Sequence, residues 1–329
     1  MNARVFVMAL AAASLLAIPG PGRAEDSLAA QIVDAMNKVY GAHPGFRANH
    51  AKGIVVEGSF APAAEAAKWT VSPIFASGKI PVTIRFSDAG GLPTVPDASP
   101  VANPHGMAIK FQLPGGSVSD MVTNSLKTFP VATGEEFRDL NLAIAASPPG
   151  APKPTALDTF VTSHPSVPKA LGAIATPASF AEEEYRGIDA FIFTNAAGKQ
   201  QAVRYVVSPE KVLHLTPDDA AKRPPDFLVD ELRARLAKAP VTFQLKAQLA
   251  AAGDPTKDAT QAWPDDRPVA QLGVLTITKV VPDSAVAEKQ LLFLPTAVTD
   301  GIAPSDDPLI TLRSEAYVLS FTRRSAVAH

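Results

Sequence analysis

Residues 310–324 read I-T-L-R-S-E-A-Y-V-L-S-F-T-R-R, and in this stretch Arg313 precedes Tyr317 by four positions. Side chains with this spacing lie one turn apart on the same face of a helix, so the guanidinium of Arg313 can hydrogen-bond the phenol oxygen of Tyr317. A neighbouring cation lowers the pKa of a phenol from about 10, and tyrosinate is one of the axial ligands that proteins offer to haem iron. The same spacing also occurs in ordinary helices, where a surface arginine lies beside a half-buried tyrosine.

Other short motifs accompany this segment in a fixed order. They are R-A-N-H-A-K-G from Arg47, V-T-I-R-F-S from Val82, N-P-H-G-M-A-I-K-F from Asn103, D-M-V-T-N-S from Asp120, D-P-T from Asp254, W-P at Trp263 and G-I-A-P-S-D-D from Gly301. Together they resemble the motifs of haem catalases, and most closely those of the shortened branch called catalase-related peroxidases. The resemblance spans roughly residues 28–324, and the shared order of several motifs makes it specific.

The resemblance implies both a fold and a cofactor. The fold would be α+β, an antiparallel β-barrel with surrounding helices around a catalase-like core. The cofactor would be haem b, iron protoporphyrin IX, with Tyr317 as the axial iron ligand and Arg313 beside it. Arg47 and Arg85 resemble the arginines that bind haem propionates, a role suited to the planar guanidinium fork.

Two residues are the candidate catalytic groups. An imidazole can take a proton from one peroxide oxygen and return it to the departing oxygen, and His50 lies in the matching motif. Asn124 matches the amide that would orient peroxide without adding charge. Ser87 matches a position that supports the histidine. Phe137 aligns with an aromatic residue facing the haem, although it fits an ordinary core position equally well.

The chain also departs from the larger catalases. Asp189 stands near the position where those enzymes have a proximal histidine, and Asn49 replaces an apolar residue before His50. Asp307 precedes Arg313 by six residues as in catalases, and we expect it to pair with Arg313. The sequence stops soon after the tyrosine helix, so we expect no counterpart of the C-terminal helical domain that carries NADPH in some catalases.

These departures favour a haem-dependent peroxidase that reduces hydrogen or organic peroxides with small organic reductants, with residual catalase activity. Two alternatives stay open: a small catalase that dismutates hydrogen peroxide, and a non-catalytic haem-binding envelope protein. The sequence does not indicate the physiological reductant or the oligomeric state.

Composition narrows the partners and the chemistry. The 329 residues carry a net charge of -2 and no basic run interrupted by aromatic residues, which argues against nucleic acid. Cysteine is absent, so disulfides, thiolate chemistry, iron–sulfur clusters and covalently attached haem are excluded.

The N-terminus has the pattern of a secretory signal peptide. A start with Arg4 precedes an apolar run over Val5–Ile18, and small residues at Gly22 and Ala24 suit cleavage after Ala24. Residues 1–24 are therefore predicted as a signal peptide and 25–329 as one catalase-like haem-binding domain, located in the periplasm or secreted. An uncleaved anchor is the alternative, although a membrane span needs about 20 apolar residues. We predict no membrane span in the mature chain.

Hydrophobic periodicity predicts the main elements. Leu28, Ile32, Met36 and Tyr40 repeat every four residues and predict a helix over 28–40, and a second helix is expected over 226–238 with Asp226 as its cap. The predicted strands are 53–60, 82–87, 107–113, 119–124, 202–207, 241–249 and 273–280. On 82–87, Thr83, Arg85 and Ser87 share a polar face, which points either into a ligand-holding barrel or to solvent.

Overall fold

The computed structural model describes residues 27–76, 78–172 and 174–326. The predicted signal peptide, residues 1–24, lies outside the described residues. Within the described ranges, no helix combines the length and the apolar character needed to cross a membrane.

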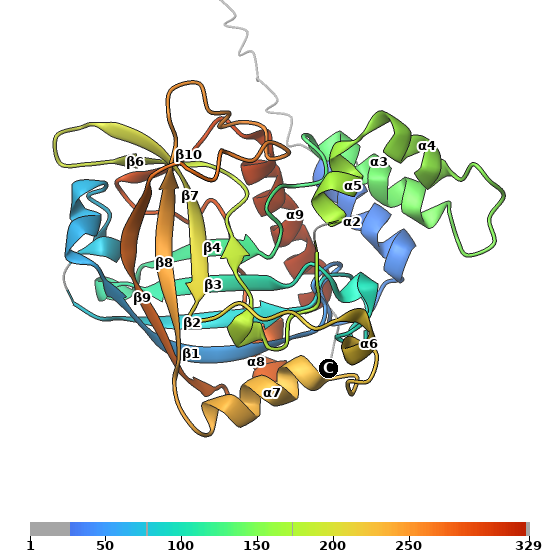
Figure 1. The fold of residues 1–329 in the computed structure, drawn as a ribbon, viewed down its shortest axis with the longest axis horizontal. Coiled ribbons are helices and arrows are strands. Elements are labelled where there is room, and N and C mark those ends of the chain that lie inside the picture. The colour runs from blue at the N-terminus through green and yellow to red at the C-terminus, as the bar shows by residue number, and fades with distance from the viewer. Residues whose placement is uncertain (1–26, 77, 173, 327–329) are drawn as a thin grey trace, which may run out of the picture.

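A closed antiparallel barrel forms the centre of the structure (Figure 1). Eight strands pair in the order β7-β5-β4-β3-β2-β1-β9-β8, and pairing of β8 with β7 closes the ring. Their bounds are β1 Gly53–Pro62, β2 Ile80–Ser87, β3 Gly106–Gln112, β4 Val118–Asn124, β5 Tyr185–Arg186, β7 Gln200–Pro209, β8 Val241–Leu249 and β9 Val269–Val280. All seven predicted strands are present, which confirms the barrel. Two further short strands, β6 Phe191–Thr194 and β10 Ile302–Pro304, extend the sheet beside β7.

The barrel interior is filled with apolar side chains. Ile84 and Phe86 of β2 point into it and are fully buried, and Phe86 packs against Tyr185 and Phe243. The other face of β2, with Arg85 and Ser87, is also buried but lies outside the barrel wall. The polar face of β2 therefore points neither into the barrel nor to solvent, and both expectations for this strand are wrong. The reason is that helices cover the outer wall of the barrel and bury this face.

The helices cover one side and the base of the barrel (Figure 1). The helix α9 contacts α2 and α3 and runs between the barrel and those helices, while α7 and α8 lie below the strands. The bounds are α2 Leu28–Tyr40, α3 Gly134–Ala145, α4 Ala156–Ser163, α5 Ser166–Leu171, α6 Pro217–Ala220, α7 Phe227–Leu236, α8 Ser284–Gln290 and α9 Pro308–Ser325. The predicted helix over 28–40 and the helix carrying the Arg313–Tyr317 pair are both confirmed.

The predicted cap of the second helix is only half right. Asp226 does occupy the N-cap position of α7, but its carboxylate makes no capping hydrogen bond and lies 2.7 Å from Lys52 Nζ. Lys52 also donates to the carbonyl of Val95 at 2.8 Å and pairs with the fully buried Asp97. A buried ammonium needs several acceptors, and this requirement outweighs the cap.

Candidate functional site

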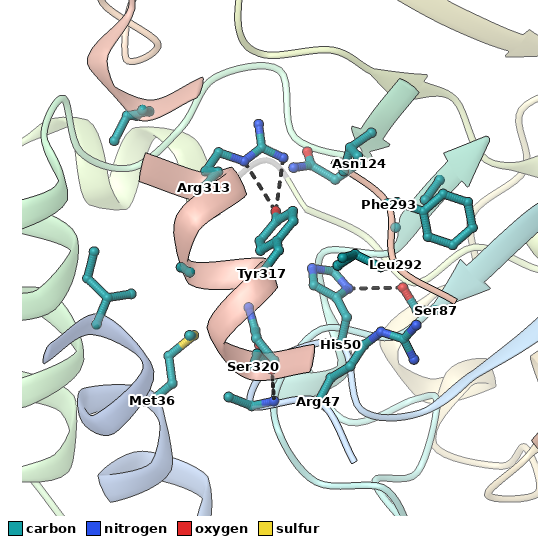
Figure 2. A pocket seen from close by; sticks show the side chains of 18 of the residues that line it. Met36, Arg47, His50, Ser87, Asn124, Leu292, Phe293, Arg313, Tyr317 and Ser320 are labelled. Atoms are coloured by element: carbon teal, nitrogen blue, oxygen red, sulfur yellow. Dashed lines mark hydrogen bonds between the residues drawn. The ribbon is translucent and has the colours of Figure 1, made fainter. Parts of the chain in front are cut away.

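A large cavity lies between the outer barrel wall and the helices α2, α3 and α9 (Figure 2). It encloses about 1260 Å³ of space between atoms, including its mouth. All eight predicted site residues line it: Arg47, His50, Arg85, Ser87, Asn124, Phe137, Arg313 and Tyr317. They come from elements far apart in sequence, and the barrel strands β2 to β4 bring them to one wall while α9 supplies the opposite one.

Tyr317 projects from α9 into this cavity, with Arg313 one turn before it. Arg313 donates from Nε and Nη2 to the phenol oxygen, each at 3.2 Å, and its Nη1 pairs with Asp189. Burial favours loss of the guanidinium proton, but the charges of Asp189 and Tyr317 outweigh it and raise the pKa of Arg313. The cation is thus fixed beside the phenol oxygen of Tyr317.

The expected pairing of Asp307 with Arg313 is wrong. Asp307 caps α9, since its Oδ1 accepts from the backbone N–H of Leu309 at 2.9 Å, and Asp189 takes the arginine instead. Burial, followed by the charge of Asp189, raises the pKa of Asp307 to about 6. Asp189, at the sequence position near which larger catalases have a proximal histidine, is therefore the direct partner of Arg313.

His50 lines the same cavity as Tyr317 and adopts a strained conformation (Figure 2). Its φ of 54° falls in the left-handed region that few non-glycine residues adopt. Two contacts hold it: the imidazole Nδ1 lies 3.0 Å from Ser87 Oγ, and Arg85 donates to the His50 carbonyl at 2.9 Å. Burial and then the charge of Arg85 lower the pKa of His50 from 6.5 to about 3. The imidazole is consequently neutral at ordinary pH and able to accept a proton.

Asn124 and Phe137 line the same cavity. The Asn124 Oδ1 accepts from the backbone N–H of Leu126 at 2.8 Å, which leaves its amide N–H groups to donate into the cavity. Phe137 lines the cavity and also packs on Phe129, with ring centroids 5.3 Å apart. It therefore belongs to the site and to the core of the helical layer at once.

The structure adds Arg324, a cavity residue that the sequence interpretation missed. It follows Tyr317 by seven positions on α9, which is two turns along the same face, and this spacing was the available signal. Arg324 and Arg47 both donate to the Leu291 carbonyl, at 2.7 and 2.8 Å. Arg324 is 7% exposed, and its Nε has no partner among the described residues.

These residues fit a haem group. Its flat apolar ring suits walls built by Ile32, Met36, Val122, Leu309 and Leu312. The Tyr317 phenol oxygen is a donor of the kind that binds haem iron, and the three guanidiniums, including the unpartnered Nε of Arg324, suit the carboxylates at the edge of the ring. No cluster of three histidine or acidic side chains able to hold a metal ion exists in the described part of the chain.

The fold and the cavity together define a β-barrel protein with a tyrosine and a histidine in the lining of one cavity outside the barrel. The family model for catalase matches residues 30–329, and the chain belongs to the catalase family. It is 36% identical over 302 residues to a catalase-related peroxidase of Mycolicibacterium paratuberculosis, covering 90% of this chain and 95% of that one. A catalase-related peroxidase of Synechococcus elongatus is 33% identical over 300 residues, which cover 90% of this chain and 88% of that one.

Solved structures show the same fold. A fungal catalase superposes with a TM-score of 0.76 and 20% identity over 86% of this chain. A bacterial catalase superposes with a TM-score of 0.75 and 22% identity, also over 86% of this chain. This chain spans 59% and 58% of those two proteins. Membership in the family implies a haem cofactor, in agreement with the donor set of the cavity.

Proposed function

We propose that this protein is a haem b peroxidase that reduces hydrogen or organic peroxides with small organic reductants. The observation that carries the proposal is the pairing, across one cavity, of the Arg313-supported phenol of Tyr317 with the neutral imidazole of His50. The peroxidase name of two relatives covering 90% of the chain supports peroxidation over dismutation.

Each residue has a separate task in this proposal. When bound, haem supplies the redox chemistry. Tyr317 would hold the iron through its phenol oxygen, and Arg313 fixes that oxygen with two hydrogen bonds. His50 accepts a proton from one peroxide oxygen and returns it to the departing oxygen, while Ser87 holds the ring and Asn124 orients the substrate.

The test is to reconstitute the full mature chain with haem, record the absorbance spectrum and add peroxide with and without a phenolic reductant. A peroxidase oxidises the phenol and evolves little oxygen. Vigorous oxygen evolution without reductant would identify a small catalase instead. A haem spectrum with no peroxide consumption would leave a non-catalytic haem-binding protein, and no haem band at all would refute the proposal.

The axial ligand has its own prediction. Tyr317→Phe removes the donor oxygen, so we expect an altered absorbance spectrum or loss of haem. Tyr205→Phe is the control, because Tyr205 is buried in the barrel against Phe191 and Phe193. Full haem retention with the parent spectrum in Tyr317→Phe would place the iron ligand elsewhere.

We further propose that the protein is exported and begins at Glu25 after cleavage behind Ala24. The charged start, the apolar run and the small residues before the cleavage position support this. N-terminal sequencing of the protein from periplasmic and culture fractions checks it. Full-length chain recovered only from the cytosol would contradict the proposal.

A further inference from the structure

Glu288, which no sequence motif singled out, lies among the arginines of the cavity wall. Its Oε2 accepts from Arg85 Nε at 3.0 Å and from Arg85 Nη2 at 2.8 Å, and it lies 3.8 Å from Arg47 Nη1. The side chains of Glu288 and Arg85 are 12% and 4% exposed. Glu288 sits on α8, whose first residue, Ser284, accepts from the backbone N–H of Val55 at 2.8 Å. The carboxylate is therefore held in place by the barrel itself.

The segment from Glu288 to Leu291 gathers three guanidiniums. Arg85 and Arg47 meet the carboxylate of Glu288, and Arg47 and Arg324 share the Leu291 carbonyl. Burial, and next the charge of Arg85, lowers the pKa of both Arg47 and Arg324, in the second case to about 10. Glu288 is the nearby charge that opposes this lowering. Without it, three buried cations would repel one another with no internal anion between them.

The charges of this wall match a ligand with two carboxylates. Three guanidiniums and one carboxylate leave a formal charge of +2, which equals in size the two negative charges of the haem propionates. Glu288 lies next to the Arg85 and Arg47 guanidiniums, which line the cavity, so its charge acts on any carboxylate that those guanidiniums bind. Attraction to the arginines and repulsion from Glu288 then act on the same ligand atoms.

We propose that Glu288 is a built-in counter-anion of the cofactor site. It holds Arg85 and Arg47 together on the cavity wall, and it weakens binding of the dicarboxylate porphyrin by repelling the propionates. Glu288 thus sets how tightly the site retains haem. This inference rests on haem being the ligand of the cavity, as in the proposed function.

The experiment follows haem loss from the full haem-loaded chain to an excess of apomyoglobin by absorbance. Glu288→Gln keeps the size of the side chain and removes its charge, so we expect haem loss to slow by roughly tenfold. Glu57→Gln is the matched control, because Glu57 pairs with Lys279 on the surface and should keep the parent rate. With haem dimethyl ester, whose propionates carry no charge, the parent and Glu288→Gln should lose the ligand equally fast.

A second variant separates charge from shape and guards against a Gln variant that does not fold. Glu288→Asp keeps the negative charge, so its rate should stay within about twofold of the parent. Two results would overturn the inference. One is a Glu288→Gln variant that loses haem as fast as the parent or faster. The other is a Glu288→Asp variant that slows haem loss as much as we expect of Glu288→Gln. A parent chain that takes up no haem would overturn the proposed function, and this inference with it. A parent that holds haem with no effect of Glu288→Gln would overturn this inference alone.

Discussion

At the scale of single residues, His50 is neutral at ordinary pH. Its pKa is lowered to about 3, so it enters the reaction neutral and can accept the first proton from peroxide. Arg85 contributes to this through its charge while also fixing the His50 carbonyl. The same arginine therefore helps to fix the position of the imidazole and adds to the effect of burial, which is the main cause of its lowered pKa.

Replacing His50 by alanine should slow the reaction with peroxide by roughly 10²-fold or more, the contribution expected of a positioned acid–base group. Asn124→Ala should cost less, because the amide only orients peroxide. Stopped-flow mixing with peroxide, followed by oxidation of a phenolic reductant, measures both rates. Haem content should stay unchanged in both variants, and His164→Ala, outside the cavity at the end of α4, is the control. A His50→Ala variant as fast as the parent would refute the proposed mechanism.

At the scale of elements, the start of β3 gives the imidazole its place. Gly106 pairs with Ser87 of β2 and with Asn124 of β4, so three cavity strands meet at this residue. A Cβ atom added to Gly106 would lie 2.8 Å from Ser87 Oγ and 3.1 Å from His50 Nδ1. The missing side chain is what allows the imidazole and the serine to lie against the strand.

Gly106→Ala should therefore displace the Ser87–His50 hydrogen bond and slow the peroxide reaction by about tenfold, with haem still bound. The double variant Gly106→Ala with Ser87→Ala tests the cause, because removal of Oγ makes room for the new methyl group. The rate of the peroxide reaction in the double variant should fall by a smaller factor than the product of the factors for the two single variants. Independent, multiplying effects in stopped-flow measurements would contradict this account.

At the scale of the whole molecule, the cavity lies outside a filled barrel and depends on buried charges for its shape. Lys52, two residues after His50, joins the histidine segment to Asp97 and to the start of α7. Burial lowers the pKa of His50 and His105 to about 3 and about 4, while it raises the pKa of Asp97 to about 7. The buried histidines and the buried carboxyl group therefore act on stability in opposite directions as pH falls.

The acid sensitivity of folding should reflect His50. Its folded pKa lies below the unfolded value, so between pH 6.5 and about 3 the unfolded chain binds a proton that the folded chain does not. This stability is present at pH 7 and is lost as pH falls. Between pH 7 and 5, His50→Gln should lose about 2 kcal/mol less unfolding free energy than the parent. Urea denaturation at both pH values, with equal haem loading and with His164→Gln as the control, measures the free energy of unfolding. Equal losses of this free energy in the parent and in His50→Gln would contradict the prediction.

The sequence by itself determined the features that depend on local spacing and on residue type. Four positions on one helix were enough to join Arg313 to Tyr317, and residue patterns located the strands, while the barrel itself was implied by the resemblance to catalases. Only the tertiary structure decided that Asp189 binds Arg313 from 124 positions away, and that Glu288 meets Arg85 across 203 positions. It also decided that the polar face of β2 points outward beneath the helices. Such contacts depend on how whole elements pack, and local periodicity does not contain that information.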